Sequence, residues 1–219
     1  MKKLLLLLIF LTIHQITAQT NPKNELGVWY MYNGSHQISN RISIKSMAHF
    51  RFFEVGDDLQ QFIGRFGATY KINNTLSATG GYAFLNTDDT YQIKGGTTNE
   101  HRIYQDFNVK HALKKLKIAH RFRAEQRFFN DIFDHFLRYQ IGFSHPINHK
   151  WSAYFYSETF FDFNEEAYNQ NWSGIGAKYQ LSKTVKLQLG YQKINVNEVG
   201  DFHRIQVGFA INTNHFKKK

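Results

Sequence analysis

One charged row in a strand-like segment most constrains how this chain can fold. Residues 119–128 alternate so that, in an extended strand, four charged side chains would share one face and Phe122 and Phe128 the other. A soluble sandwich would turn the charged face to solvent, whereas a transmembrane barrel would turn it inward and the apolar face to lipid. The four charged residues are Arg121, Arg123, Glu125 and Arg127.

The same alternation recurs along the chain in about eleven segments. Many of them have the length of roughly 9–11 residues that a tilted membrane strand needs, and they exceed the roughly 5–6 residues usual in soluble sheets. No helical amphipathic segment competes with them. The segments are 26–32, 41–52, 62–72, 76–85, 100–111, 119–128, 136–144, 151–162, 171–180, 184–194 and 202–212.

The connections between these segments alternate between short and long. Short periplasmic turns opposite longer external loops are typical of outer-membrane barrels. We therefore predict an all-β fold, a transmembrane antiparallel β-barrel of about ten to twelve strands, with both termini in the periplasm. Tight turns are expected at 73–74, 113–115, 148–149 and 182–183, and longer loops at 55–58, 86–99, 130–134, 163–170 and 195–201.

The short first segment, 26–32, raises a question of strand parity. Bacterial single-chain barrels have an even number of strands, because an odd number would leave the first and last strands parallel. Ten strands starting at Arg41, with 26–32 as an adjunct or inner segment, would satisfy this rule. Twelve would need one further strand, and the role of 26–32 stays open.

The N-terminus predicts export. Lys2 and Lys3 precede an apolar run at 4–13, which is too short to span a bilayer, and small residues follow at 16–19. We expect a signal peptide at 1–18 and a single barrel domain at 19–219 in the outer membrane. The chain has no cysteine, so neither disulfides nor a lipid-accepting thiol are expected.

The positive charge of the chain is dispersed rather than clustered. Removing Lys2 and Lys3 leaves 25 of the 27 basic residues against 17 acidic ones, and only 217–219 form a basic run. A nucleic-acid partner is therefore not expected, and membrane lipid is. The mean hydropathy of -0.48 suits a barrel whose lipid-facing and lumen-facing residues alternate. The oligomeric state is not predicted.

Three motifs carry a resemblance to a known family. They are Glu-His-Arg-Ile-Tyr-Gln at 100–105, Arg-Phe-Arg-Ala-Glu-Gln-Arg at 121–127 and Leu-Arg-Tyr-Gln at 137–140, joined by Gly-Val-Trp at 27–29 and Tyr-Ser-Glu at 156–158. Through them nearly the whole mature chain resembles the domain-of-unknown-function 2490 family of Gram-negative outer-membrane proteins. The resemblance implies an exported β-barrel with a charged interior, and it implies no activity or substrate.

Charged residues inside a narrow barrel must be paired or hydrated, because a buried lone charge is costly. Nine charged residues from consecutive segments are expected to form a lumen network. Such a network either plugs the barrel or, because arginine outnumbers the carboxylates, selects small anionic solutes. The nine are Glu100, Arg102, Asp106, Arg121, Arg123, Glu125, Arg127, Arg138 and Glu158.

Two other function classes are weighed. The loops at 86–99 and 163–170 could bind a partner at the cell surface. A lipid-modifying enzyme would need a Ser/His/acid site, and no Gly-x-Ser-x-Gly motif is present, so no catalytic residue is predicted. The candidates for such a site are His49 and His203 on the inner face, His135 near an outer loop, and Ser157 beside Glu158.

Neither a metal nor another cofactor is expected. The 11 histidines are scattered without the spacing of a metal motif, and thiolates are absent. The pair Gly95 and Gly96 lies in an acidic loop that no helix follows, so it does not form a phosphate-binding loop.

Overall fold

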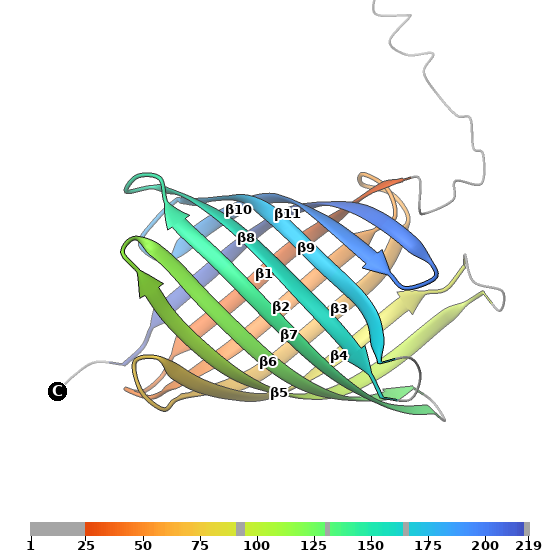
Figure 1. The fold of residues 1–219 in the computed structure, drawn as a ribbon, viewed down its shortest axis with the longest axis horizontal. Helices are drawn as coiled ribbons and strands as arrows, with labels where there is room; N and C mark the ends of the chain where they lie inside the picture. The colour runs from red at the N-terminus through yellow and green to blue at the C-terminus, as the bar shows by residue number, and fades with distance from the viewer. Residues whose placement is uncertain (1–24, 91–94, 130–131, 164–166, 217–219) are drawn as a thin grey trace, which may run out of the picture.

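The computed structural model describes residues 25–90, 95–129, 132–163 and 167–216. Within these ranges eleven β-strands close into a barrel (Figure 1). The described residues contain no helix that is long and apolar enough to cross a membrane. The strands are β1 Leu26–Gln37, β2 Ile42–Phe52, β3 Leu59–Lys71, β4 Leu76–Asp88, β5 Thr97–Leu113, β6 Leu116–Phe129, β7 Ile132–Pro146, β8 Trp151–Asp162, β9 Tyr168–Gln180, β10 Val185–Val196 and β11 Gly200–Asn214.

The predicted fold class is confirmed, with a correction to strand parity. Each strand pairs antiparallel with its neighbour in sequence, and β1 closes the barrel by pairing with β11 in parallel. Of the two alternatives for 26–32, the adjunct to ten strands is excluded, and the segment is a full strand of the barrel. The segment expected at 26–32 continues through the polar residues 33–37, whose backbone is satisfied by pairing with β2 and β11 on both sides.

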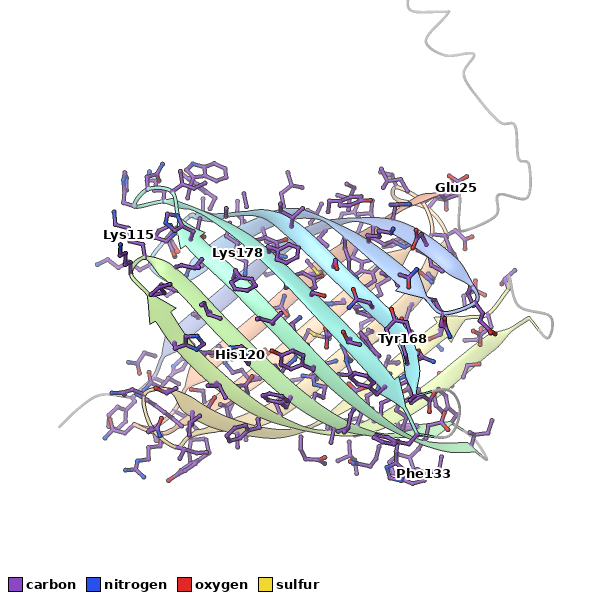
Figure 2. All side chains as sticks on the ribbon, viewed as in Figure 1. Glu25, Lys115, His120, Phe133, Tyr168 and Lys178 are labelled. Carbon is purple, nitrogen blue, oxygen red and sulfur yellow. The ribbon has the colours of Figure 1, made fainter. Side chains whose placement is uncertain are left out.

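An odd number of strands places the first and last residues of the barrel at opposite ends. The tight turns lie at one end, called here the turn end, and the longer connections lie at the other, the loop end (Figure 1). Figure 2 shows Lys115 at the turn end and Glu25 at the loop end. The expectation that both termini lie on one side of the membrane is therefore wrong for the described chain. The expected signal peptide at 1–18 lies outside the described residues.

Several strands run further toward the loop end than expected. β6 ends at Phe129 and β7 begins at Ile132, so the loop expected at 130–134 is largely strand. β4 and β5 likewise reach Asp88 and Thr97, and their hairpin projects beyond the other strands (Figure 1). Parts of the two loops considered for partner binding, 91–94 and 164–166, lie outside the described residues.

Four of the turns at the turn end share one local design. In each, the side-chain oxygen of a Ser or Asn accepts hydrogen bonds from the backbone N–H groups two and three residues later, as Asn73 Oδ1 does from Thr75 at 2.8 Å and Leu76 at 2.7 Å. This Asx or Ser turn closes a hairpin without glycine. The equivalent acceptors in the other three turns are Ser39, Asn148 and Ser182.

An apolar residue precedes each of these acceptors and points outward. Ile38, Ile72, Ile147 and Leu181 are all exposed, as is Leu113, the last residue of β5 before the fifth turn. They form an aliphatic rim around the turn end. Between this rim and the loop end the outward side chains are also largely apolar.

The burial pattern is the reverse of that in a soluble protein. Outward residues such as Phe66, Leu189 and Ile175 are 64%, 62% and 57% exposed, whereas Glu125 and Gln192 are fully buried. Soluble proteins bury apolar side chains and expose charged ones. The barrel therefore presents an apolar outer surface around an interior that is rich in charged and polar side chains and also contains two small apolar clusters.

Candidate functional site

The structure brings all nine charged residues expected in the lumen into one network on β5, β6, β7 and β8. Glu125 lies at its centre, fully buried. Its carboxylate is 2.7 Å from Arg127, 2.8 Å from Arg138, 3.1 Å from Arg102 and 3.5 Å from Arg123. One carboxylate is thus shared by four guanidinium groups.

The remaining carboxylates complete the network on either side of Glu125. Arg123 donates two hydrogen bonds to Asp106, at 2.5 and 2.8 Å. Arg121 and Arg138 both donate to Glu158, at 2.7 and 2.8 Å. Charge-assisted, two-point contacts of this kind are the strongest hydrogen bonds between side chains.

Strand register explains why these residues meet. Asp106 is directly opposite Arg123 across β5 and β6, and Arg123 is opposite Arg138 across β6 and β7. Directly opposite residues have Cβ atoms roughly 4.5–5.5 Å apart. Arg102 also bonds Glu100 on its own strand at 2.6 and 2.8 Å. The alternation of the sequence is thereby converted into one continuous set of ion pairs.

A second hydrogen-bonded cluster in the interior consists of uncharged polar side chains. Tyr156 donates to Gln192 at 2.7 Å and accepts from Gln206 at 2.9 Å, and Gln188 donates to Tyr154 at 2.9 Å. These side chains come from β8, β10 and β11. Sequence reasoning did not single them out, because glutamine and tyrosine are common on either face of a strand.

Three further arginines face the interior without an ion pair to any described residue. Arg51 donates to Gln61 at 2.7 Å and lies over the ring of Trp29 at 3.7 Å. Arg204 donates to the backbone carbonyls of His203 and Glu25. The third is Arg65, which has no hydrogen bond to a described residue. Alternation alone predicted that Arg51 and Arg65 lie on charged faces. They were not included in the expected network, because that network was limited to the consecutive segments from 100–111 to 151–162.

The interior contains three cavities in series along the barrel. A cavity of about 580 Å³ lies at the loop end, one of about 330 Å³ in the middle, and one of about 620 Å³ at the turn end. Arg65 lines both the first and the second. Lys110, Ala210 and Asn212 line both the second and the third.

Cations outnumber carboxylates among the described residues that line each cavity. The loop-end cavity has six arginines against two carboxylates, and the middle cavity five cations against one carboxylate. The turn-end cavity has five lysines and no acidic residue among its described lining. Figure 2 shows one of these lysines, Lys178, nearer the turn end of its strand than Tyr168. The five are Lys110, Lys117, Lys150, Lys178 and Lys186.

The residues considered for a Ser/His/acid site do not come together. Ser157 points outward and bonds Asn171, whereas Glu158 points into the lumen. His203, expected on the inner face, is instead on the outer face against Tyr191, because it has the same parity as the outward Ile205 and Val207.

The other two histidines are also apart from each other. His135 lies outside beside Phe133, with ring centroids 4.4 Å apart, and His49 lies inside with Nε2 3.3 Å from Asn33. Among the described residues no group of three or more His, Asp or Glu side chains is placed to bind a metal ion.

Comparison with known proteins settles the family. The family model described as a protein of unknown function, DUF2490, matches residues 26–206. The chain belongs to this family. The match runs from the start of β1 into β11, so it includes the whole network of this DUF2490 barrel, and the predicted resemblance is confirmed. No curated protein matches the chain.

Solved structures resemble this DUF2490 barrel in fold. The NanC porin aligns with a TM-score of 0.54 and 10% identity, covering 85% of this chain and 98% of the porin. The KdgM porin in complex with disordered oligogalacturonate aligns at 0.48 and 14%, covering 78% and 85%. A loop-deletion mutant of OmpT, an outer-membrane protein of Vibrio cholerae, aligns at 0.46 and 9%, covering 75% and 57%. At such identities the likeness to NanC extends to the barrel fold alone.

Proposed function

We propose that this protein is an outer-membrane barrel that lets small anionic solutes pass. The observation that carries the proposal is the series of three cavities whose described linings all have an excess of cations. A charged channel raises the local concentration of ions of opposite sign. Rings of Arg and Lys side chains are a recognised way of selecting anions.

The outer surface supports the placement in a membrane. Exposed apolar side chains cover the middle of the barrel, and the aliphatic rim borders its turn end. A soluble monomer rarely exposes a contiguous apolar patch of more than a few hundred square ångströms. We place the turn end in the periplasm and the loop end outside, as in other outer-membrane barrels. The fold of the NanC porin agrees with this placement.

The two parts of the interior have different roles in this proposal. The ion-pair network around Glu125 is internally neutralised to within one charge, with five arginines and four carboxylates, and so it mainly holds β5 to β8 together. The arginines and lysines outside it remain available to a solute. An anion moving from the loop-end to the middle cavity passes Arg65, because that side chain lines both.

The proposal includes the organisation of the whole chain. Residues 1–18 act as a cleaved leader, and 19–219 form the barrel domain. The protein acts by passage and not by catalysis. The serine and the carboxylate considered for catalysis, Ser157 and Glu158, lie on opposite faces of β8.

Vesicles containing the full-length mature protein are expected to take up chloride at least roughly fivefold faster than potassium, since one unit charge at contact distance in water is worth about 1 kcal/mol. Chloride entry is followed with a chloride-quenched dye, with valinomycin balancing charge. Potassium entry is followed with a pH dye and a protonophore. Uptake no faster than in protein-free vesicles, or faster entry of potassium, would contradict the proposal.

A further inference from the structure

Three arginines in the loop-end cavity lack a counter-charge among the described residues, and two of them, Arg51 and Arg65, also lack the backbone carbonyl acceptors that Arg204 has. Arg51 and Arg65 both line this cavity, and neither forms an ion pair with a described residue. Each has a buried Nε without a hydrogen-bond partner. The arginines of the neighbouring network differ from them, because each of those is within 4 Å of a carboxylate.

Other cations surround these two side chains. Arg65 is repelled by Arg123, Arg138 and Arg102 and attracted by Glu125, while Arg51 is repelled by Arg138 and Arg102 and attracted by Glu158. Removing a cation from water without a partner is unfavourable. A bound anion would remove this cost, because it supplies both negative charge and acceptor oxygens.

Arg51 is held in one orientation. It donates to Gln61 at 2.7 Å, and Gln61 in turn donates to Thr87 at 2.7 Å. The guanidinium carbon lies 3.7 Å from the ring centre of Trp29, and a β-bulge follows Arg51 in its pairing with β3. Bulges at barrel rims reorient side chains toward functional sites. The unused Nε is therefore pre-organised, which lowers the entropy lost on binding.

An aromatic wall borders the same cavity. Trp29 and Trp172 have ring centroids 5.3 Å apart, and Phe160 and Trp172 4.7 Å apart. All three line the loop-end cavity. A second β-bulge, between Phe160 and Phe161, lies beside this wall. The cavity thus combines free guanidinium donors with apolar ring surface.

We propose that the loop-end cavity binds one small organic acid, with its carboxylate at Arg51 and Arg65 and its carbon skeleton against Trp29, Phe160 and Trp172. The proposal rests on the proposed passage and names its preferred solute class. Arginine suits a carboxylate because its fork offers two parallel donors. At about 580 Å³ the cavity has the volume usual for small-molecule sites.

Tryptophan fluorescence tests the site without relying on conductance. The chain has three tryptophans, and Trp151 lies on the outer face at the turn end, 44% exposed. In the Trp151→Phe variant both remaining tryptophans line the cavity. Titration with cyclohexanecarboxylate at constant ionic strength is expected to give a saturable change with a Kd on the order of 1 mM.

Two further probes separate the contributions to binding. Cyclohexylmethanol, which has the ring without the charge, is expected to bind at least about tenfold more weakly, because charge-assisted hydrogen bonds are roughly twice as strong as neutral ones. Sulfate has the charge without the ring and is expected to bind more weakly as well. Equal binding by the alcohol, or tighter binding by sulfate, would overturn the assignment of an organic acid.

Substitutions identify the donors. Arg65→Gln and Arg51→Gln, in the Trp151→Phe background, are each expected to weaken cyclohexanecarboxylate binding about tenfold or more. Arg65→Lys is expected to retain charge but lose most of the affinity, because lysine lacks the planar fork. Arg41→Gln is the matched control, since Arg41 is exposed at a turn and outside the cavities. No saturable change in the Trp151→Phe parent, whatever its conductance, would refute the site. If the Trp151→Phe parent bound cyclohexanecarboxylate saturably but carried no current, the binding site would stand and the proposed passage would be refuted.

Discussion

Glu125→Gln is expected to lower the free energy of unfolding of the barrel by about 3–5 kcal/mol, the cost of breaking a buried ion pair by removing one partner. Glu125 is fully buried and is shared by four arginines at 2.7 to 3.5 Å. Glutamine keeps the shape but removes the charge. The four guanidiniums would then repel one another around a neutral amide.

Chemical unfolding of the barrel in lipid vesicles, followed by tryptophan emission, measures this change. Glu198→Gln is the matched control, because Glu198 is exposed near the loop end and forms no ion pair with a described residue. The control is expected to change stability by less than about 0.5 kcal/mol, as is usual at the surface. If Glu125→Gln were as stable as this control, the network would not hold the strands together.

A triple variant, Lys150→Glu, Lys178→Glu and Lys186→Glu, is expected to reduce the ratio of anion to cation permeability at least about fivefold. The three lysines line the turn-end cavity, in which no described residue is acidic. Their replacement changes a lining of five cations into one with more carboxylates than lysines. A single charge beside an ion in water is worth about 1 kcal/mol, or roughly a fivefold change.

The control for this variant places the same charges outside the cavity. Lys114, Lys115 and Lys183 are exposed at the turn end and do not line a cavity. Their replacement by Glu gives the same net charge. The permeability ratio of both triple variants is measured in 1 M salt, where the Debye length is about 3 Å. Charges on the outside of the turn end are then screened from ions in the cavity. If both triple variants shifted selectivity equally, the effect would come from overall charge and not from the lining.

Alternation in the sequence predicted which face most side chains take, and it did so for physical reasons. A strand has a period of two, so one outward apolar residue fixes the direction of its neighbours. This reasoning placed Arg121, Arg123 and Arg127 inside together. The same reasoning places His203 on the outer face, because it is two residues before Ile205 and therefore on the same side of the strand.

Contacts across the barrel could not be predicted in the same way. The pairing of β1 with β11 depends on closure, which joins the two ends of the chain and leaves no local pattern. Residues 33–37 are all polar or glycine, so they lack the apolar alternation from which strands were predicted, and the second half of β1 was not predicted. The lysines of the turn-end cavity come from four different strands and one turn, so nothing in the sequence shows that they gather at one end of the barrel.

The reversal potential of the protein in a planar bilayer tests anion passage most directly. With a tenfold gradient of potassium chloride across the bilayer, the current through the wild-type barrel is expected to reverse at a voltage with the sign of the chloride equilibrium potential. A reversal potential of the opposite sign, or no current above that of the bare bilayer, would contradict the proposed anion passage.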